Sequence, residues 1–252
     1  ERQGKIPGAR GSLRMCWPHV HNAKACAALR VLRSTCMDPE SELRASYRDM
    51  VSRRRLAVLN HSRGQVGYVH VPDMERLGFA DFHRLFAVES QRNGLIVDLR
   101  GNLGGYISEL CLQKLAQRRL ALCQTRYSRP VPYPSGAPPA ATAVLVDELT
   151  ASDGELLAYA CRERSLAVLV GRRTHGSLLG VGQGLPLIDG SELGVPSEVL
   201  LGLPGQLENS GVEPDILCPL TPSEVWSRTD TVIEAALRHL LNALQGGGTA
   251  GE

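Results

Sequence analysis

The stretch that most constrains the fold of this chain is residues 147–155, Asp-Glu-Leu-Thr-Ala-Ser-Asp-Gly-Glu. An apolar, β-rich run at residues 142–146 leads into it, and apolar residues at helical spacing, beginning at Leu156, lead out of it. Ser152 is therefore predicted to lie on a turn between a strand and a helix. Its hydroxyl would then lie beside the free amides and the positive dipole end of the helix, where an oxyanion is stabilised.

Ser152 also has a simpler interpretation, because serine and aspartate commonly cap helices. No Gly-x-Ser-x-Gly motif surrounds it, and no histidine lies nearby in the sequence. A second strand–turn–helix pattern favours the catalytic interpretation. Residues 95–105, Leu-Ile-Val-Asp-Leu-Arg-Gly-Asn-Leu-Gly-Gly, read as an apolar strand and a glycine-rich turn, and a helical stripe starts at Ile107. Two such units can direct two helix N-termini at one cleft.

The sequence resembles the tricorn-like branch of the tail-specific, or C-terminal processing, serine peptidases. The resemblance covers about residues 39–244 and rests on five short segments whose order and spacing are jointly specific. They are residues 67–74 (Gly-Tyr-Val-His-Val-Pro-Asp-Met), 98–105 (Asp-Leu-Arg-Gly-Asn-Leu-Gly-Gly), 150–155 (Thr-Ala-Ser-Asp-Gly-Glu), 171–176 (Gly-Arg-Arg-Thr-His-Gly) and 208–215 (Glu-Asn-Ser-Gly-Val-Glu-Pro-Asp). The resemblance implies the crotonase-like core of layered ββα units that this family shares.

The resemblance also implies a set of catalytic residues. Ser152 matches the nucleophile, and the backbone amides of Gly105 and Asp153 match the oxyanion hole. A glycine suits the first of these positions because bare backbone can approach a substrate closely. Glu208 matches the acid that helps to orient and polarise the base in the tricorn branch. Without the resemblance, it would be interpreted as an acid on a loop.

The general base is not evident from the sequence. The tricorn branch uses a histidine preceded by a serine, upstream of a PDZ domain, and the first 64 residues here contain no Ser-His pair. The other branch uses a lysine 25 residues after the nucleophile, where this chain has Ser177, so a Ser/Lys dyad is excluded. His175 is the internal candidate, although it can also replace an aromatic ring of the tricorn pattern as packing. His70, on a predicted strand, is interpreted as structural.

Specificity for basic residues is not predicted. Tricorn peptidases with that preference use an acid between the glycine turn and the nucleophile. The position 21 residues beyond Asn102, where this acid is expected, is Cys123.

Alternating strand and helix patterns predict an α/β fold. A helix beginning near Asp38 is expected to end in a solvated basic run at residues 53–55, and residues 65–71 alternate as a strand. The Pro-rich residues 129–139 are expected to form a stiff surface loop, and residues 185–203 short hairpin strands. The predicted domains are a basic, poorly ordered extension (1–38), a helix and turn (39–64), the catalytic domain (65–244) and a flexible tail (245–252).

Charge is divided unevenly along the chain. Residues 1–64 carry 13 Lys or Arg and 5 Asp or Glu, whereas the remainder carries 15 and 21. The basic front could be a targeting segment, but it lacks the aromatic residues and motifs expected for specific nucleic-acid binding. No run approaches the ~18 apolar residues of a membrane span. The seven cysteines form no Cys-x-x-Cys pair, which favours reduced thiols, and no motif predicts a metal or cofactor.

The predicted function is a serine endopeptidase or peptide-trimming hydrolase that acts on peptides or unfolded polypeptide. A cytoplasmic location is expected, or an organelle if the basic front is a targeting segment, and homo-oligomers are expected by resemblance. The chain, which begins at Glu1, could be a fragment. Two alternatives stay open. One is a non-catalytic peptide-binding or assembly subunit without a base, and the other is a crotonase-like acyl-CoA enzyme whose paired amides polarise a thioester.

Overall fold

A computed structural model describes residues 38–182, 184–203, 207–219, 221–222, 226 and 229–246. Among the described residues, those at 38–48 and those from Asp49 onward belong to separate units, and the second unit contains the sheet and the candidate site. The predicted basic extension lies outside the described residues apart from Asp38. The predicted domain boundaries therefore stay predictions.

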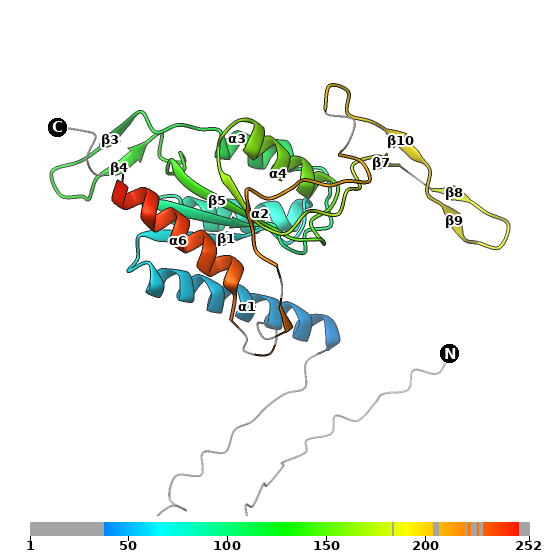
Figure 1. Cartoon of the computed structure of the whole chain (residues 1–252), viewed down its shortest axis with the longest axis horizontal. Helices are drawn as coiled ribbons and strands as arrows, with labels where there is room; N and C mark the ends of the chain where they lie inside the picture. Colours follow the sequence, from blue (N-terminus) through cyan, green and yellow to red (C-terminus); the bar gives the residue numbers. More distant parts are fainter. Residues whose placement is uncertain are drawn as a thin grey trace, which may run out of the picture. The chain divides into compact units, whose positions relative to one another are not determined.

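The second unit is built on a parallel five-stranded sheet with the order β1-β2-β5-β6-β11 (Figure 1). Its strands are β1 (Val66–His70), β2 (Gly94–Asp98), β5 (Ala141–Val146), β6 (Val168–Gly171) and β11 (Ile216–Leu217). The helices are α1 (Pro39–His61), α2 (Arg76–Glu89), α3 (Ser108–Leu115), α4 (Asp153–Glu163) and α6 (Thr231–Gly246). Three antiparallel ribbons pair β3 (Ala121–Cys123) with β4 (Val131–Tyr133), β7 (Gly180–Val181) with β10 (Pro196–Glu198), and β8 (Leu185–Pro186) with β9 (Glu192–Leu193).

The strand order determines which helices cover which face. Strands β1, β2, β5 and β6 are added in one direction, so right-handed crossovers place α2, α3 and α4 on one face, whereas α6 packs on the other (Figure 1). A sheet covered on both faces needs apolar strands throughout. All five residues of β1 are buried, and the strand predicted over residues 65–71 is confirmed as Val66–His70. The α/β prediction is confirmed, and the crotonase-like layering stays a prediction.

Three local predictions need correction. The basic run at residues 53–55 is not a solvated helix end, because α1 continues to His61 and two of the three arginines are partly buried in ion pairs. Arg55 lies 2.5 Å from the buried carboxylate of Glu89. The Pro-rich segment contains β4, which pairs with β3. Helix α6 extends to Gly246, two residues into the segment predicted as a flexible tail.

Among the described cysteines, Cys111, Cys123 and Cys161 are free thiols. Cys111 and Cys161 lie in the apolar core between the sheet, α3 and α4, and burial raises the pKa of each to about 12. Cys218 is also buried, and Cys123 is exposed on β3. Within the described ranges, no helix is both long and apolar enough to cross a membrane. The same residues contain no group of three or more His, Cys, Asp or Glu able to hold a metal ion.

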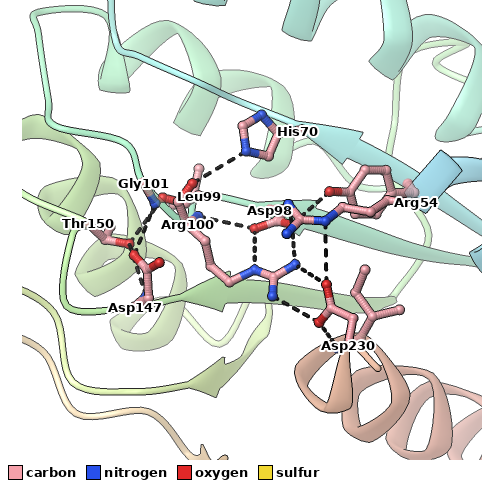
Figure 2. A network of polar contacts seen from close by, with 11 residues as sticks. Arg54, His70, Asp98, Leu99, Arg100, Gly101, Asp147, Thr150 and Asp230 are labelled. Atoms are coloured by element: carbon pink, nitrogen blue, oxygen red, sulfur yellow. Dashed lines mark hydrogen bonds and ion pairs between the residues drawn. The ribbon is translucent and has the colours of Figure 1, made fainter. Parts of the chain in front are cut away.

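A buried polar cluster lies at the carboxyl end of β2 (Figure 2). Asp98 accepts a hydrogen bond from the Tyr68 hydroxyl at 2.7 Å and two from the Arg100 guanidinium at 2.7 and 2.9 Å. The guanidinium also donates to Asp230, which precedes α6, at 2.9 and 3.0 Å. Arg54 of α1 lies 3.5 Å from Asp98 and 3.4 Å from Asp230. The cluster therefore connects α1, β1, β2 and the start of α6.

The charges in this cluster determine its protonation state. Burial alone would raise the pKa of Asp98, but Arg100, helped by Arg54, holds it well below the usual range. Burial and the Asp98 charge raise the pKa of Tyr68, so its hydroxyl stays protonated and donates. Burial lowers the pKa of His70, whose Nε2 lies 3.3 Å from the Arg100 carbonyl oxygen. This buried position agrees with the interpretation of His70 as structural.

Replacing Asp98 with Asn should lower the free energy of unfolding by about 3–5 kcal/mol at pH 7, because it removes the fully buried one of the two carboxylates that pair with Arg100. A carboxyl whose folded pKa is depressed stabilises the fold above its unfolded pKa of about 3.9, and this stability is lost as pH falls toward the folded value. Below about pH 5 the wild type should therefore lose more stability than Asp98→Asn. Urea unfolding at a series of pH values measures both effects.

Arg44→Ala is the control for this measurement. It breaks the ion pair between Arg44 and Glu40, whose side chains are 63% and 72% exposed, and should cost at most about 0.5 kcal/mol. Equal pH dependence in the wild type and Asp98→Asn would contradict the prediction.

Candidate functional site

The candidate site is formed by two turns at the carboxyl ends of the neighbouring strands β2 and β5. The glycine turn (residues 101–105) follows β2, and the serine turn (residues 147–152) follows β5. The strand register pairs Asp98 with Leu145, so the two turns begin at the same edge of the sheet. Gly101 N–H donates to the Asp147 carboxylate at 3.0 Å, and the Thr150 hydroxyl donates to the Leu99 carbonyl at 3.0 Å (Figure 2).

Ser152 has an unusual backbone conformation at the start of α4. Its φ of 52° and ψ of −123° correspond to the first central position of a type II′ turn, which normally holds glycine. A residue with a Cβ atom in such a conformation costs about 1–3 kcal/mol and persists only where the surroundings hold it. Such strain at a strand-to-helix turn is a known feature of nucleophilic serines.

The glycine turn touches Ser152 directly. Gly104 has a φ of 103°, and a Cβ atom placed on it would lie 2.6 Å from Ser152 Cβ. A Cβ atom on Gly105 would lie 2.0 Å from the Met74 carbonyl oxygen, which accepts a hydrogen bond from Tyr106 N–H at 2.7 Å. The Asn102 carbonyl accepts from Ala151 N–H at 2.8 Å, which joins the two turns. Both close approaches, at Gly104 and at Gly105, require residues without side chains.

The two predicted oxyanion donors flank this contact. Among the residues that the structure describes, neither the Gly105 N–H nor the Asp153 N–H has a hydrogen-bond acceptor. The Asp153 carboxylate is already engaged, because it accepts from both the backbone N–H, at 2.8 Å, and the hydroxyl of Ser108. This contact joins the N-termini of α3 and α4. The main-chain amides therefore remain as donors for an oxyanion.

Glu155 is a site residue that the sequence analysis did not single out. Its fully buried carboxylate accepts hydrogen bonds from the backbone N–H groups of Ser152 at 3.2 Å, Gly176 at 2.7 Å and Ser177 at 2.8 Å, and from the Thr174 hydroxyl. It therefore joins the serine turn to the segment after β6. The Ser-x-x-Glu spacing of a capping box was the signal that could have identified it.

His175 lies on the segment that follows β6, and Glu208 contacts the backbone of the same segment. The Glu208 carboxylate accepts from the N–H groups of Leu178 and Leu179 at 2.7 and 3.0 Å. His175 N–H donates to the Thr150 carbonyl at 2.9 Å, so its backbone lies beside the serine turn, and its side chain is exposed. In the described part of the chain, no hydrogen bond joins the His175 ring to Ser152 or Glu208.

Comparison with known proteins places this arrangement in a family. The sequence profile of peptidase family S41 matches residues 65–218. The chain belongs to this family. The resemblance seen in the five short segments is therefore confirmed at the level of the family.

Two relatives and one solved structure extend the comparison. The S41 chain is 35% identical over 204 residues to the tricorn protease homolog of Saccharolobus solfataricus and 34% identical over 201 residues to the tricorn protease of Thermoplasma acidophilum. Each match covers 79% of this chain and 19% of the relative, so the chain spans about a fifth of their length. The crystal structure of the tricorn protease matches with a TM-score of 0.74 and 34% identity, over 79% of this chain and 20% of that one.

Gly104→Ala should destabilise the S41 chain by about 2–5 kcal/mol, because a left-handed φ and a close contact with Ser152 both penalise the new methyl group. Gly101→Ala is the matched control. Gly101 has a φ of 74°, but a Cβ atom placed on it would meet no other atom within 4 Å, so only the cost of the left-handed φ, about 1–2 kcal/mol, is expected. Urea unfolding measures both variants. Equal losses would show that the contact with Ser152 is not restrictive.

Glu155→Gln should lower the free energy of unfolding by about 1–3 kcal/mol. The NH₂ group of the new side-chain amide would face backbone N–H groups that now donate hydrogen bonds to the carboxylate. Hydrogen exchange measured by mass spectrometry should become faster at Gly176 and Ser177. Glu148→Gln is the control, since the Glu148 side chain is 58% exposed and pairs with Arg172 at the surface. Unchanged exchange in Glu155→Gln would argue against Glu155 as the residue that holds this segment.

Proposed function

We propose that this chain carries a serine-peptidase centre with Ser152 as its nucleophile. The observation that carries the proposal is the strained turn of Ser152, in contact with Gly104 and flanked by the amides of Gly105 and Asp153. A backbone that holds a serine in a costly conformation beside two free N–H donors is suited to form and stabilise an oxyanion.

The proposed reaction is acyl transfer through Ser152. Its Oγ forms a bond to the substrate carbonyl carbon while its proton passes to a base. The π electrons of the carbonyl move to the oxygen, which receives hydrogen bonds from Gly105 and Asp153 N–H. Collapse of this intermediate breaks the C–N bond, and the leaving amine takes the proton from the base. Water, deprotonated by the same base, then hydrolyses the acyl ester and restores the Ser152 hydroxyl.

The base that we propose within the described residues is His175. Its backbone is held beside Thr150, two residues before Ser152, and its ring is exposed at this edge of the sheet. Glu208 supports the proposal by holding the amides of Leu178 and Leu179, so we assign it the role of orienting the segment that carries His175. The alternative source of the base is a histidine outside these 252 residues.

The proposed substrates are peptides or unfolded polypeptide, since the relatives named above are tricorn proteases and homologues. Assembly into homo-oligomers and a cytoplasmic location are carried over from the resemblance as parts of the same proposal. A basic preference at the scissile bond is not part of the proposal, because the position where its specificity acid is expected is Cys123, which is exposed on β3.

A fluorophosphonate probe tests the proposal, because it reacts with an activated serine and leaves an adduct that peptide mass mapping locates. We expect one adduct, on Ser152, that is absent from Ser152→Ala. His175→Ala should label at least about 100-fold more slowly, which is the contribution of a positioned general base. His61→Ala, which removes an exposed histidine of α1, should label at the wild-type rate.

The other outcomes distinguish the alternatives. Unchanged labelling in His175→Ala would remove His175 from the mechanism. A folded chain that stays unlabelled would show that the centre is not competent in these 252 residues, and would favour the non-catalytic peptide-binding alternative.

A further inference from the structure

An arm leaves the candidate site between β6 and Glu208. We use this name for residues 180–182 and 184–201, which contain the ribbons β7–β10 and β8–β9 (Figure 1). In the described part of the chain, neither ribbon packs extensively against a helix or the five-stranded sheet. Two-stranded ribbons of this kind are marginally stable in water unless something covers them.

Apolar side chains are exposed along the whole arm. Leu185 and Leu193 lie directly opposite each other on β8 and β9, so their side chains share one face. Ile188, at the tip, and Leu201 are at least 90% exposed. The exposed apolar residues of the arm are Val181, Leu185, Leu187, Ile188, Leu193, Val195, Val199, Leu200 and Leu201. Nine exposed apolar side chains within one short segment are typical of an interaction surface.

The root of the arm is tied to the serine turn. Ser177 N–H donates to Glu155, which also accepts from Ser152 N–H, and the next two amides, of Leu178 and Leu179, donate to Glu208. The arm starts one residue later, at Gly180. A chain bound along the arm would therefore be led toward Ser152.

Charge and backbone chemistry indicate what the arm binds. Residues 178–203 contain three acids, Asp189, Glu192 and Glu198, and no Lys or Arg. A second copy placed arm against arm would bring like charges together. Pro186 and Pro196 each interrupt the row of N–H donors on their strands, which disfavours extension of the ribbons by another strand. A partner that contacts the side chains and carries positive charge fits both features.

We propose that the arm binds an extended polypeptide rich in apolar and basic residues and guides it to Ser152. This inference rests on the proposed function, because the bound polypeptide is the substrate. The basic side chains of the bound polypeptide contact the arm. They are not the side chain next to the scissile bond.

The test uses the Ser152→Ala chain, so that binding is measured without turnover. The probe is a fluorescein-labelled 14-residue peptide of alternating valine and lysine, followed by fluorescence anisotropy. Adding Ile188→Ser and Leu201→Ser should weaken its binding at least about tenfold. Glu192→Gln with Glu198→Gln should weaken it several-fold and reduce its salt dependence. Leu77→Ser, which removes a leucine that is 68% exposed on α2, is the matched control and should change nothing.

Three results would overturn the proposal. The first is no binding of the valine–lysine peptide at 1 mM, which is about the weakest affinity of interest. The second is equally tight binding of a valine–glutamate peptide. The third is binding by the arm variants that is as tight as that of the chain with an unchanged arm. Sedimentation velocity provides a fourth, since self-association that the arm variants abolish would identify a second copy as the occupant. Labelling of Ser152 by the small fluorophosphonate probe is measured separately. A chain that binds the peptide but is not labelled would show that the peptidase centre is not competent in these 252 residues and would leave the arm as a binding surface.

Discussion

The Glu155 carboxylate, buried at the start of α4, accepts hydrogen bonds from the serine turn and from the segment after β6, and the geometry of the site depends on this interaction. A buried charge is costly unless N–H and O–H groups replace its hydration. Here the donors come from Ser152 and from a segment about twenty residues further along the chain. If either segment moved away, the buried carboxylate would lose hydrogen-bond donors, which is unfavourable. The two segments are therefore held in place together.

A second buried carboxylate, that of Asp98, holds the strand that leads into the glycine turn. Asp98 and Arg100 lie at the end of β2, and their contacts with Arg54 of α1 and Asp230, which precedes α6, anchor the strand end to both helices (Figure 2). The turn that follows is then positioned by two hydrogen bonds, from Gly101 N–H to the Asp147 carboxylate and from Ala151 N–H to the Asn102 carbonyl. Ion pairs therefore fix the end of β2, whereas backbone hydrogen bonds and glycines shape the turn beside Ser152.

Sequence patterns predicted the two strand–turn–helix units well, because apolar strands, glycine turns and helix starts are determined by nearby residues. The interactions that depend on distant residues could not be predicted in this way. Arg54 and Arg55 read as solvated because their partners, Asp98 and Glu89, are 44 and 34 residues away. Glu155 was noted only as the last residue of the motif at residues 150–155. Its hydrogen bonds were not predicted, since the donors after β6 become its neighbours only when the sheet forms. The exposure of the arm likewise depends on which elements pack against it.

The conformation of Ser152 has a consequence for how this chain can change. Glycine would adopt a φ of 52° and a ψ of −123° without the steric cost that a Cβ atom brings. The serine therefore makes the fold less stable than glycine would at the same position. A chain that needed only the turn would gain by giving up this side chain, whereas one that needs a hydroxyl has to accept a less stable scaffold. For the Ser152 nucleophile that we propose, selection for stability and selection for reactivity therefore oppose each other at this position.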